Sequence, residues 1–287
     1  ELRIVEQVRA RLDTARAPTE HHRERMLEGI GRRTIEVGHS VLGHVNLLGA
    51  AVIGIGYSIL HPHTVRMREL TAQFEQVCLN AIPVVALVTL LIGVVIAYLL
   101  GLQAEQFGAN IFVVDGVGIG ATREFAPIIV AVIVAGRSGA AFTAQLGSMR
   151  LTEETDAIRT LGLSPLDVLV LPRVIALMIA MPLLVFVGDV MSLVGAMLIA
   201  QPMLDITPTT FVARLRDTLD ISPPLVGLAK APVFALVIAV IGCRMGMSVE
   251  RDTRAVGMAT TSTVVQSIVS VILLDAAFAV FFQEIGV

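Results

Sequence analysis

Long apolar segments alternate with short polar links over most of the chain, and this pattern predicts helices that cross a membrane. The segment 79–102 carries no charged side chain over 24 residues. About 20 apolar residues are enough to span the hydrocarbon core of a bilayer. Four later segments have a similar length and composition. The predicted spans are 79–102, 124–149, 174–200, 223–243 and 264–282.

The segment 41–60 is apolar and long enough to span, but it contains His44, Asn46 and four glycines. It therefore predicts an interfacial or shallow helix, with a full span as the alternative. The following His-Pro-His at 61–63 predicts a loop rather than a metal site. Together these segments predict an all-α integral membrane protein with one interfacial helix and five transmembrane helices.

Residues 1–40 differ from the rest because they hold fifteen of the 45 charged side chains. The mixture of arginines and acids over 20–39 indicates either a solvated amphipathic helix or a helix on the membrane surface. The whole chain is 55% hydrophobic and 16% charged, with net charge −3 and mean hydropathy +0.81. This composition excludes ordinary soluble and disordered proteins and gives no reason to expect nucleic acid.

Arginine placement predicts the orientation in the membrane. The links 137–173 and 244–254 hold seven arginines, whereas 103–122 and 203–222 hold two. The first pair of links is therefore predicted to be cytoplasmic. This arrangement places the N-terminus in the cytoplasm and the C-terminus on the far side.

The sequence contains no catalytic or metal-binding motif. It lacks a nucleotide-binding G-x-x-x-x-G-K-[ST] loop, an H-E-x-x-H motif and a G-x-S-x-G motif. The two cysteines, Cys78 and Cys243, lie in or beside apolar segments, which predicts small buried side chains rather than a disulfide. The chain is therefore expected to bind no cofactor and no metal of its own.

A short acidic helix is predicted over 150–162, in one of the cytoplasmic links. Glu153 and Asp156 are three residues apart and lie on one helix face, and Arg150 and Glu154 are spaced to form an ion pair. This segment is predicted to be either a solvated connector or a docking helix for a cytoplasmic partner.

The ends of this short helix are also indicated by the sequence. Thr152 is predicted to cap its N-terminus, and Gly162 and Pro165 are predicted to end it.

Charged residues inside apolar segments need a partner or a wet cavity. Arg123 and Glu124 are predicted at the start of a helix, either as a pair at the membrane interface or as the mouth of a substrate path. Asp189, Lys230 and Asp275 fall within predicted spans and are expected to pair inside the bundle.

Arg137 interrupts the predicted span 124–149, so it must lie near an interface or against protein.

Several long runs of the sequence resemble the MlaE/YrbE permeases of MCE-type ABC lipid transporters. The similarity extends from about residue 45 to the C-terminus. The runs that carry it are GLQ at 101–103, TREFAP at 122–127, AGRSGAAFTAQLGSM at 135–149, EETDA at 153–157, LPR at 171–173 and ATT at 259–261 followed by Val264 and Val265.

The resemblance implies a homodimeric permease domain over 41–287, in a bacterial inner membrane, with an interfacial elbow helix and five spans per protomer. Two copies of a separate ATPase, which binds ATP and Mg, would dock below it, and a periplasmic MCE protein would sit on the other side. The transported substrate would be phospholipid. Some members carry a STAS-like domain, whose tail the run 1–16 could be.

The resemblance also implies roles for particular residues. The run from Glu153 to Ala157, with the neighbouring Arg150, would couple the permease to the ATPase, and Lys230 and Asp275 occupy charged family positions. The residues expected to line the lipid path are Leu100, Gln103, Arg123 and Glu124.

Two other functions remain open from the residues alone. The first is an ion-coupled secondary transporter that uses Asp189 and Asp275 as proton sites. The second is an intramembrane aspartyl protease built on the same two residues, although 186–189 lacks the second glycine and no tyrosine precedes Asp275.

Overall fold

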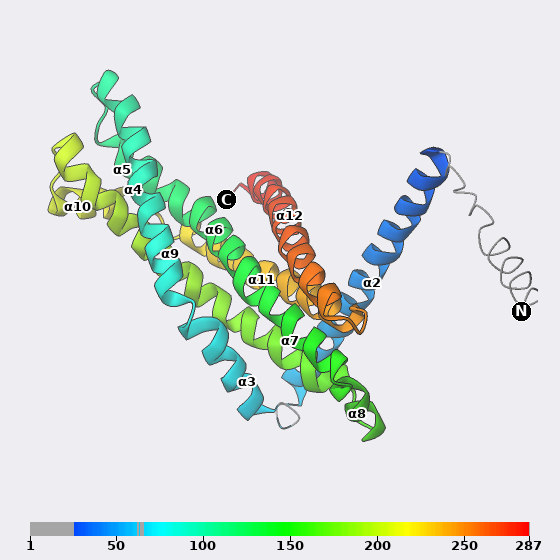
Figure 1. Cartoon of the computed structure of the whole chain (residues 1–287). Helices are drawn as coiled ribbons and strands as arrows, with labels where there is room; N and C mark the ends of the chain where they lie inside the picture. Colours follow the sequence, from blue (N-terminus) through cyan, green and yellow to red (C-terminus); the bar gives the residue numbers. More distant parts are fainter. Residues whose placement is uncertain (1–25, 62, 64–65, 287) are drawn as a thin grey trace, which may run out of the picture. The chain divides into compact units, whose positions relative to one another are not determined.

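The computed structural model describes residues 26–61, 63 and 66–286 (Figure 1). The predicted segment 1–16 and the first part of the arginine-rich stretch 20–39 lie outside these residues. The chain divides into a smaller unit that ends at Gly43 and a larger unit that begins at His44. The larger unit contains every site discussed below.

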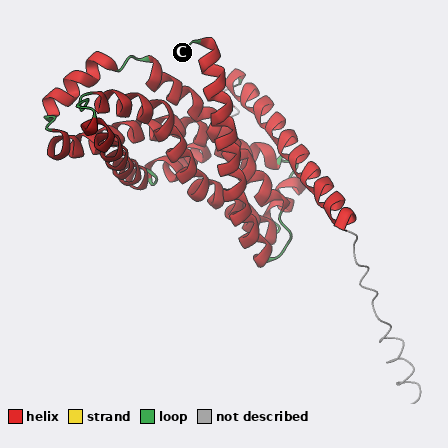
Figure 2. Ribbon diagram, turned by 90° about the horizontal axis from the view of Figure 1, so that it is seen from above, coloured by secondary structure: helices red, strands yellow, loops and turns green. Residues whose placement is uncertain are grey.

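The described residues form helices without a strand, as the all-α prediction requires (Figure 2). Among these residues, three of the long helical stretches contain π-helical turns, labelled η, and the stretch from Phe112 to Leu151 contains two of them. The elements are α2 (Met26–Leu60), α3 (Met67–Phe74), η2 (Glu75–Leu79), α4 (Ile82–Gln106), α5 (Phe112–Gly120), η3 (Ala121–Phe125), α6 (Ala126–Val134), η4 (Ala135–Gly139), α7 (Ala140–Leu151), α8 (Glu154–Thr160), η5 (Leu166–Val170), α9 (Leu171–Leu204), α10 (Pro208–Thr218), α11 (Ser222–Ser248) and α12 (Thr253–Ile285).

Six helical stretches among the described residues are long and apolar enough to cross a membrane. Five contain the predicted spans and are longer than predicted, because the residues that flank each predicted span continue the helix. The sixth is the segment predicted to be interfacial. The stretches are Val41–Leu60, Met67–Gln106, Phe112–Leu151, Leu166–Leu204, Ser222–Ser248 and Thr253–Ile285.

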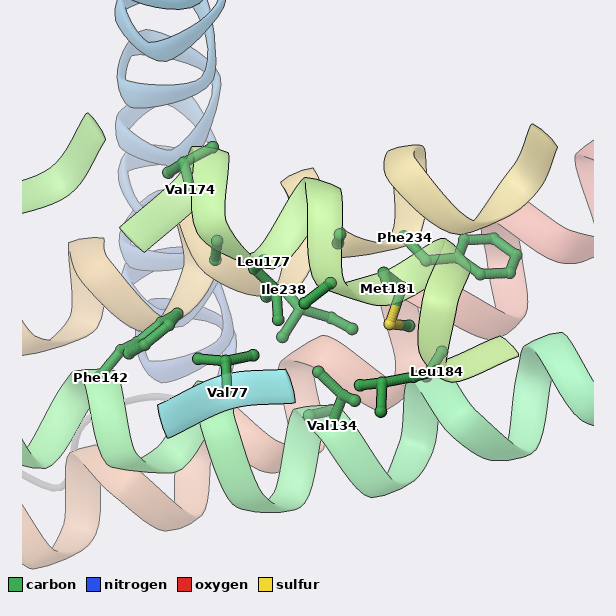
Figure 3. Packing of buried hydrophobic residues seen from close by; sticks show 14 of the residues in the cluster. Val77, Val134, Phe142, Val174, Leu177, Met181, Leu184, Phe234 and Ile238 are labelled. Carbon is green, nitrogen blue, oxygen red and sulfur yellow. The ribbon is translucent and has the colours of Figure 1, made fainter. Parts of the chain in front are cut away.

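The core of the larger unit lies where α9 and α11 pack against α6 and α7 (Figure 3). Leu177 and Leu184 of α9 are completely buried, as are Phe234 and Ile238 of α11. Both cysteines are free and buried, as predicted. Because a bilayer is as apolar as these side chains, the close fit between helices rather than the removal of water holds this core together.

Glycines bring α4 and α9 into backbone contact. A Cβ added to Gly93 of α4 would lie 2.0 Å from the carbonyl oxygen of Ser192, and one added to Gly195 of α9 would lie 2.0 Å from that of Leu90. No side chain fits at either position, so the two helices approach as closely as their backbones allow.

The part of α2 in the larger unit contacts the ends of two other helices. His44 Nδ1 lies 3.4 Å from Arg244 Nη1, one turn before α11 ends. A Cβ added to Gly54 would lie 2.7 Å from Leu171 Cδ2, at the beginning of α9. Both contacts are at the end of the bundle that carries α8, because α7 and α9 flank α8 there.

Candidate functional site

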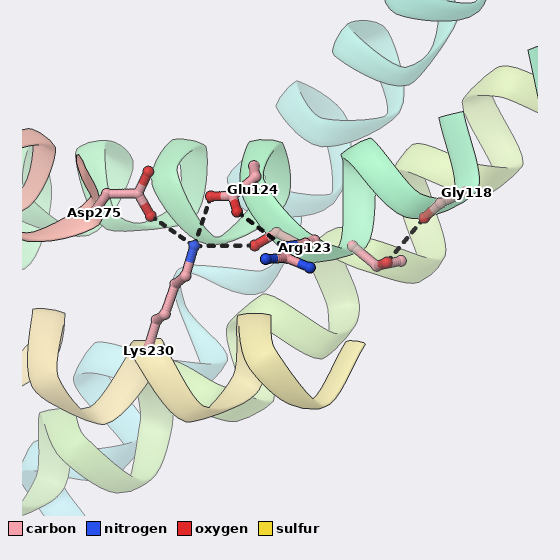
Figure 4. A network of polar contacts seen from close by, with 6 residues as sticks. Gly118, Arg123, Glu124, Lys230 and Asp275 are labelled. Carbon is pink, nitrogen blue, oxygen red and sulfur yellow. Dashed lines mark hydrogen bonds and ion pairs between the residues drawn. The ribbon is translucent and has the colours of Figure 1, made fainter. Parts of the chain in front are cut away.

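Four charged residues form a cluster between η3, α11 and α12 (Figure 4). Lys230 has no exposed surface, and its Nζ lies 2.5 Å from Glu124 Oε2 and 3.1 Å from Asp275 Oδ1. Glu124 also accepts a hydrogen bond from Arg123 Nε at 3.3 Å. We call Arg123, Glu124, Lys230 and Asp275 the charged cluster. Its two cations balance its two carboxylates.

The local sequence explains how the cluster assembles. Pro127 has no N–H, so the carbonyl of Arg123, four residues earlier, lacks its α-helical donor. That carbonyl instead lies 3.5 Å from Lys230 Nζ. Gly227 lets α11 approach this point, because a Cβ there would lie 2.2 Å from the carbonyl oxygen of Thr122.

The prediction that Arg123 and Glu124 lie at a helix start is wrong. Helix continues without interruption from Phe112 to Leu151, and the pair occupies the π-helical turn η3 within it. The second half of the predicted link 103–122 is therefore helical, and Asp115 is its only charged side chain.

The cluster's charges also differ in exposure. The side chains of Arg123 and Glu124 are 25% and 29% exposed, whereas that of Asp275 is 11% exposed. Glu124 therefore connects a partly exposed arginine with a fully buried lysine.

The other two predicted path residues lie on α4. Leu100 is 38% exposed, and its Cδ1 would be 3.6 Å from a Cβ added to Gly116 of α5. Gln103 is exposed one turn further along. No hydrogen bond joins either residue to the charged cluster within the described part of the chain.

Asp189 does not join the cluster, although its pairing was expected. It is 5% exposed on α9, and its Oδ1 has no hydrogen-bond partner among the described residues. Asp275 is bound to Lys230 instead. The two aspartates thus share no hydrogen bond, and an aspartyl protease would need them to share a proton.

The predicted short acidic helix is present as α8. Arg251, in the link between α11 and α12, binds two of its acidic residues. Arg251 Nη1 lies 2.6 Å from Glu153 Oε1, and its Nη2 lies 2.7 Å from Asp156 Oδ2. Arg251 follows α11, so these contacts join the two links predicted to share one side of the membrane. Glu153, Glu154 and Ala157 are exposed.

The C-terminal end of α8 is the one predicted. Gly162 has a φ of +76°, its N–H donates to the Arg159 carbonyl at 3.0 Å, and that of Leu163 donates to the Ile158 carbonyl at 3.2 Å. This pair of bonds is a Schellman motif, in which glycine adopts the left-handed conformation at low cost.

Two details predicted for the N-terminal end are wrong. Thr152 ends α7 rather than capping α8, and Glu153 occupies the cap position with a φ of +60°. Arg150 donates to the carbonyl of Met247 and forms no ion pair with Glu154. The chain turns at Glu153, so Arg150 and Glu154 lie on different helices and lose their helical spacing.

Another ion pair between elements lies at the opposite end of the bundle. Arg214 of α10 lies 2.8 Å through Nε and 2.5 Å through Nη2 from the carboxylate of Asp115 on α5. The Arg214 guanidinium also lies over the ring of Phe112. Figure 1 shows α5 and α10 together at the end away from α8. Sequence spacing gave no sign of this pair, because 99 residues separate its members.

Comparison with known proteins agrees with this architecture. The family model described as Permease MlaE matches residues 70–281. A probable ABC transporter permease protein of Rickettsia felis is 33% identical over 256 residues, covering 89% of this chain and 97% of its own. A probable ABC transporter permease protein of Synechocystis sp. is 30% identical and covers 86% of this chain and 95% of its own.

A more distant relative comes from a plant. The chloroplastic protein TRIGALACTOSYLDIACYLGLYCEROL 1 of Arabidopsis thaliana is 29% identical over 220 residues, covering 77% of this chain and 63% of its own. The family match covers most of the chain and includes the charged cluster and α8. This chain belongs to the MlaE permease family.

Proposed function

We propose that this membrane permease works as a subunit of an ATP-driven transporter that moves phospholipid between the inner membrane and the periplasmic side. In this proposal a separate ATPase dimer hydrolyses ATP and an MCE protein receives or delivers the lipid. The permease naming of the relatives supports the ATPase partner. The name of the Arabidopsis relative contains a glycerolipid, which agrees with a lipid substrate.

The observation that carries this proposal is the exposed acidic helix α8, whose residues Glu153 and Asp156 are both bound by Arg251. Helix α8 connects α7 to η5 and α9, and Arg251 ties it to the link between α11 and α12. A displacement of α8 would therefore be transmitted to the four helices α7, α9, α11 and α12. Such an exposed helix is suited to transmit the closure of a nucleotide-binding partner, because rigid elements can carry small displacements over long distances.

The lipid path in this proposal includes Leu100, Gln103, Arg123 and Glu124. Leu100 supplies apolar surface for acyl chains, while Arg123 and Glu124 supply partly exposed charge for a headgroup. Lys230 holds Glu124 in place from inside the bundle. Two protomers would enclose the path.

The proposed placement puts the α8 end in the cytoplasm. The arginine-rich links around α8 and Arg251 favour this side. Residues 44–60 would then lie in the cytoplasmic interface, because they contact the ends of α11 and α9 on that side.

Charge reversal on α8 tests the proposal directly. We expect the double variant Glu153→Lys and Glu154→Lys to recover much less ATPase than the unaltered chain when the complex is purified by a tag on the permease. The matched control is Glu105→Lys with Asp217→Lys, two exposed acids toward the opposite end. Equal ATPase recovery with the α8 variant, or equal loss with the control, would count against coupling through α8.

A further inference from the structure

Arg137 is a membrane-depth arginine for which the described residues supply no counter-charge. It occupies η4, the π-helical turn between α6 and α7, and is partly exposed. It forms no ion pair and no hydrogen bond to residues 26–61, 63 or 66–286. An intramembrane arginine costs roughly 2.5–3.5 kcal/mol on insertion scales, so its persistence indicates a functional partner.

A pocket of about 150 Å³ opens beside this arginine. Two further polar side chains line it, the amide of Gln76 and the hydroxyl of Ser138, and neither makes a side-chain hydrogen bond within the described residues. The remaining lining is apolar. The pocket residues are Gln76, Val77, Arg137, Ser138, Ala141 and Phe142.

The chemistry of this pocket indicates an anionic ligand with an apolar part. The guanidinium, the amide and the hydroxyl can all donate hydrogen bonds, and guanidinium groups bind phosphate oxygens in pairs. No carboxylate lines the pocket, whereas Val77, Ala141 and Phe142 offer apolar contacts.

A carboxylate from a second copy is a weaker candidate for this role. Glu124 and Asp275 are bound to Lys230, and Asp189 is 5% exposed. These described membrane-depth acids are therefore not free to leave their own protomer.

The depth of Arg137 fits a lipid headgroup on the α8 side. Residues 143–146 pack against 242–246 of α11, the stretch that His44 reaches. Arg137 lies about two turns, or about 10 Å, deeper along the helix. A long arginine side chain can bridge much of that distance toward the headgroups.

We propose that Arg137, with Gln76 and Ser138, binds the phosphate of a phospholipid from the leaflet on the α8 side, with the adjoining acyl chains against Val77, Ala141 and Phe142. This site is separate from the charged cluster. It rests on the chain being embedded in a membrane and does not require phospholipid to be the transported substrate.

Lipid binding to the purified, delipidated permease tests this site. Phosphatidylglycerol is titrated in detergent and counted per protomer by native mass spectrometry. We expect Arg137→Gln to lose one bound lipid, or to bind it about tenfold more weakly, because a charge-assisted hydrogen-bond pair is removed. Arg137→Lys keeps the charge and should lose less. The control Arg68→Gln, at an exposed arginine of α3, should bind as the unaltered chain does.

A second variant distinguishes loss of lipid binding at this site from loss of folding. Ala141→Leu fills the pocket and leaves the arginine in place, so it should also lower lipid binding. Diacylglycerol, which has acyl chains without phosphate, and inorganic phosphate, which has no acyl chains, should both bind much more weakly than phosphatidylglycerol. Unchanged lipid counts in Arg137→Gln and Ala141→Leu, or equal binding of diacylglycerol, would overturn the proposal. Loss of dimer mass with unchanged lipid would assign Arg137 to a contact between copies instead.

Discussion

Lys230 carries the positive charge that the carboxylates of Glu124 and Asp275 share. Replacing it with methionine leaves Glu124 and Asp275 facing each other without that cation. Breaking a buried ion pair costs about 3–5 kcal/mol, because the remaining charge loses its partner without regaining water. We therefore expect Lys230→Met to lower the thermal unfolding temperature of the permease in detergent.

The matching control removes all three charges. The triple variant Glu124→Gln, Lys230→Met and Asp275→Asn should recover much of the lost stability, because neutral replacement of a buried charge group is often tolerated. A Lys230→Met variant that melts at the original temperature would show that the cluster does not depend on this lysine.

For single residues, the sequence showed which charges need a partner within the membrane, but it did not show which residues those partners are. The sequence marks Lys230 and Asp275 as membrane-depth charges that need compensation, and the structure joins them. Arg251 and Arg214 gave no such sign, because they lie in polar segments where charges are ordinary. Their partners are 95 to 99 residues away in the chain, and only the packing of helices brings them together.

At the scale of elements, the contact between α4 and α9 depends on glycine. A Cβ at Gly93 would collide with the backbone of Ser192, which cannot move aside as a flexible side chain could. We expect Gly93→Val to separate these helices and destabilise the fold by about 1–3 kcal/mol or more. Thermal unfolding in detergent measures the loss.

Gly257→Ala in α12 is the control for this prediction. A Cβ at Gly257 meets nothing within 4 Å, and alanine favours helix over glycine. This variant should be as stable as the unaltered chain or more stable. Equal stability of Gly93→Val would mean that α4 and α9 are less closely held than the structure shows.

Helix identity was predictable from apolar length, whereas helix ends were not. The apolar pattern locates the central part of each helix, so the helix that continues beyond a predicted span, as at 112–123, was not predicted. Gly162 was found because a glycine after a short helix is a direct conformational signal. Thr152 was misplaced because a threonine can end one helix as readily as it can begin the next.

At the scale of the molecule, the orientation in the membrane makes a separate prediction. With Cys78 and Cys243 replaced by alanine, single cysteines are introduced as Thr160→Cys on α8 and Thr209→Cys on α10, both at exposed positions. A membrane-impermeant maleimide should label Thr209→Cys in spheroplasts and Thr160→Cys only after lysis. The reverse pattern would place α8 outside the cytoplasm.

The most direct test of the central claim is lipid movement by the reconstituted permease. The chain is placed in liposomes with fluorescent phospholipid, with and without its proposed ATPase partner. We expect lipid redistribution that requires both the ATPase and hydrolysable ATP. Transport by the chain alone under an imposed ion gradient, unchanged by the ATPase and ATP, would contradict it.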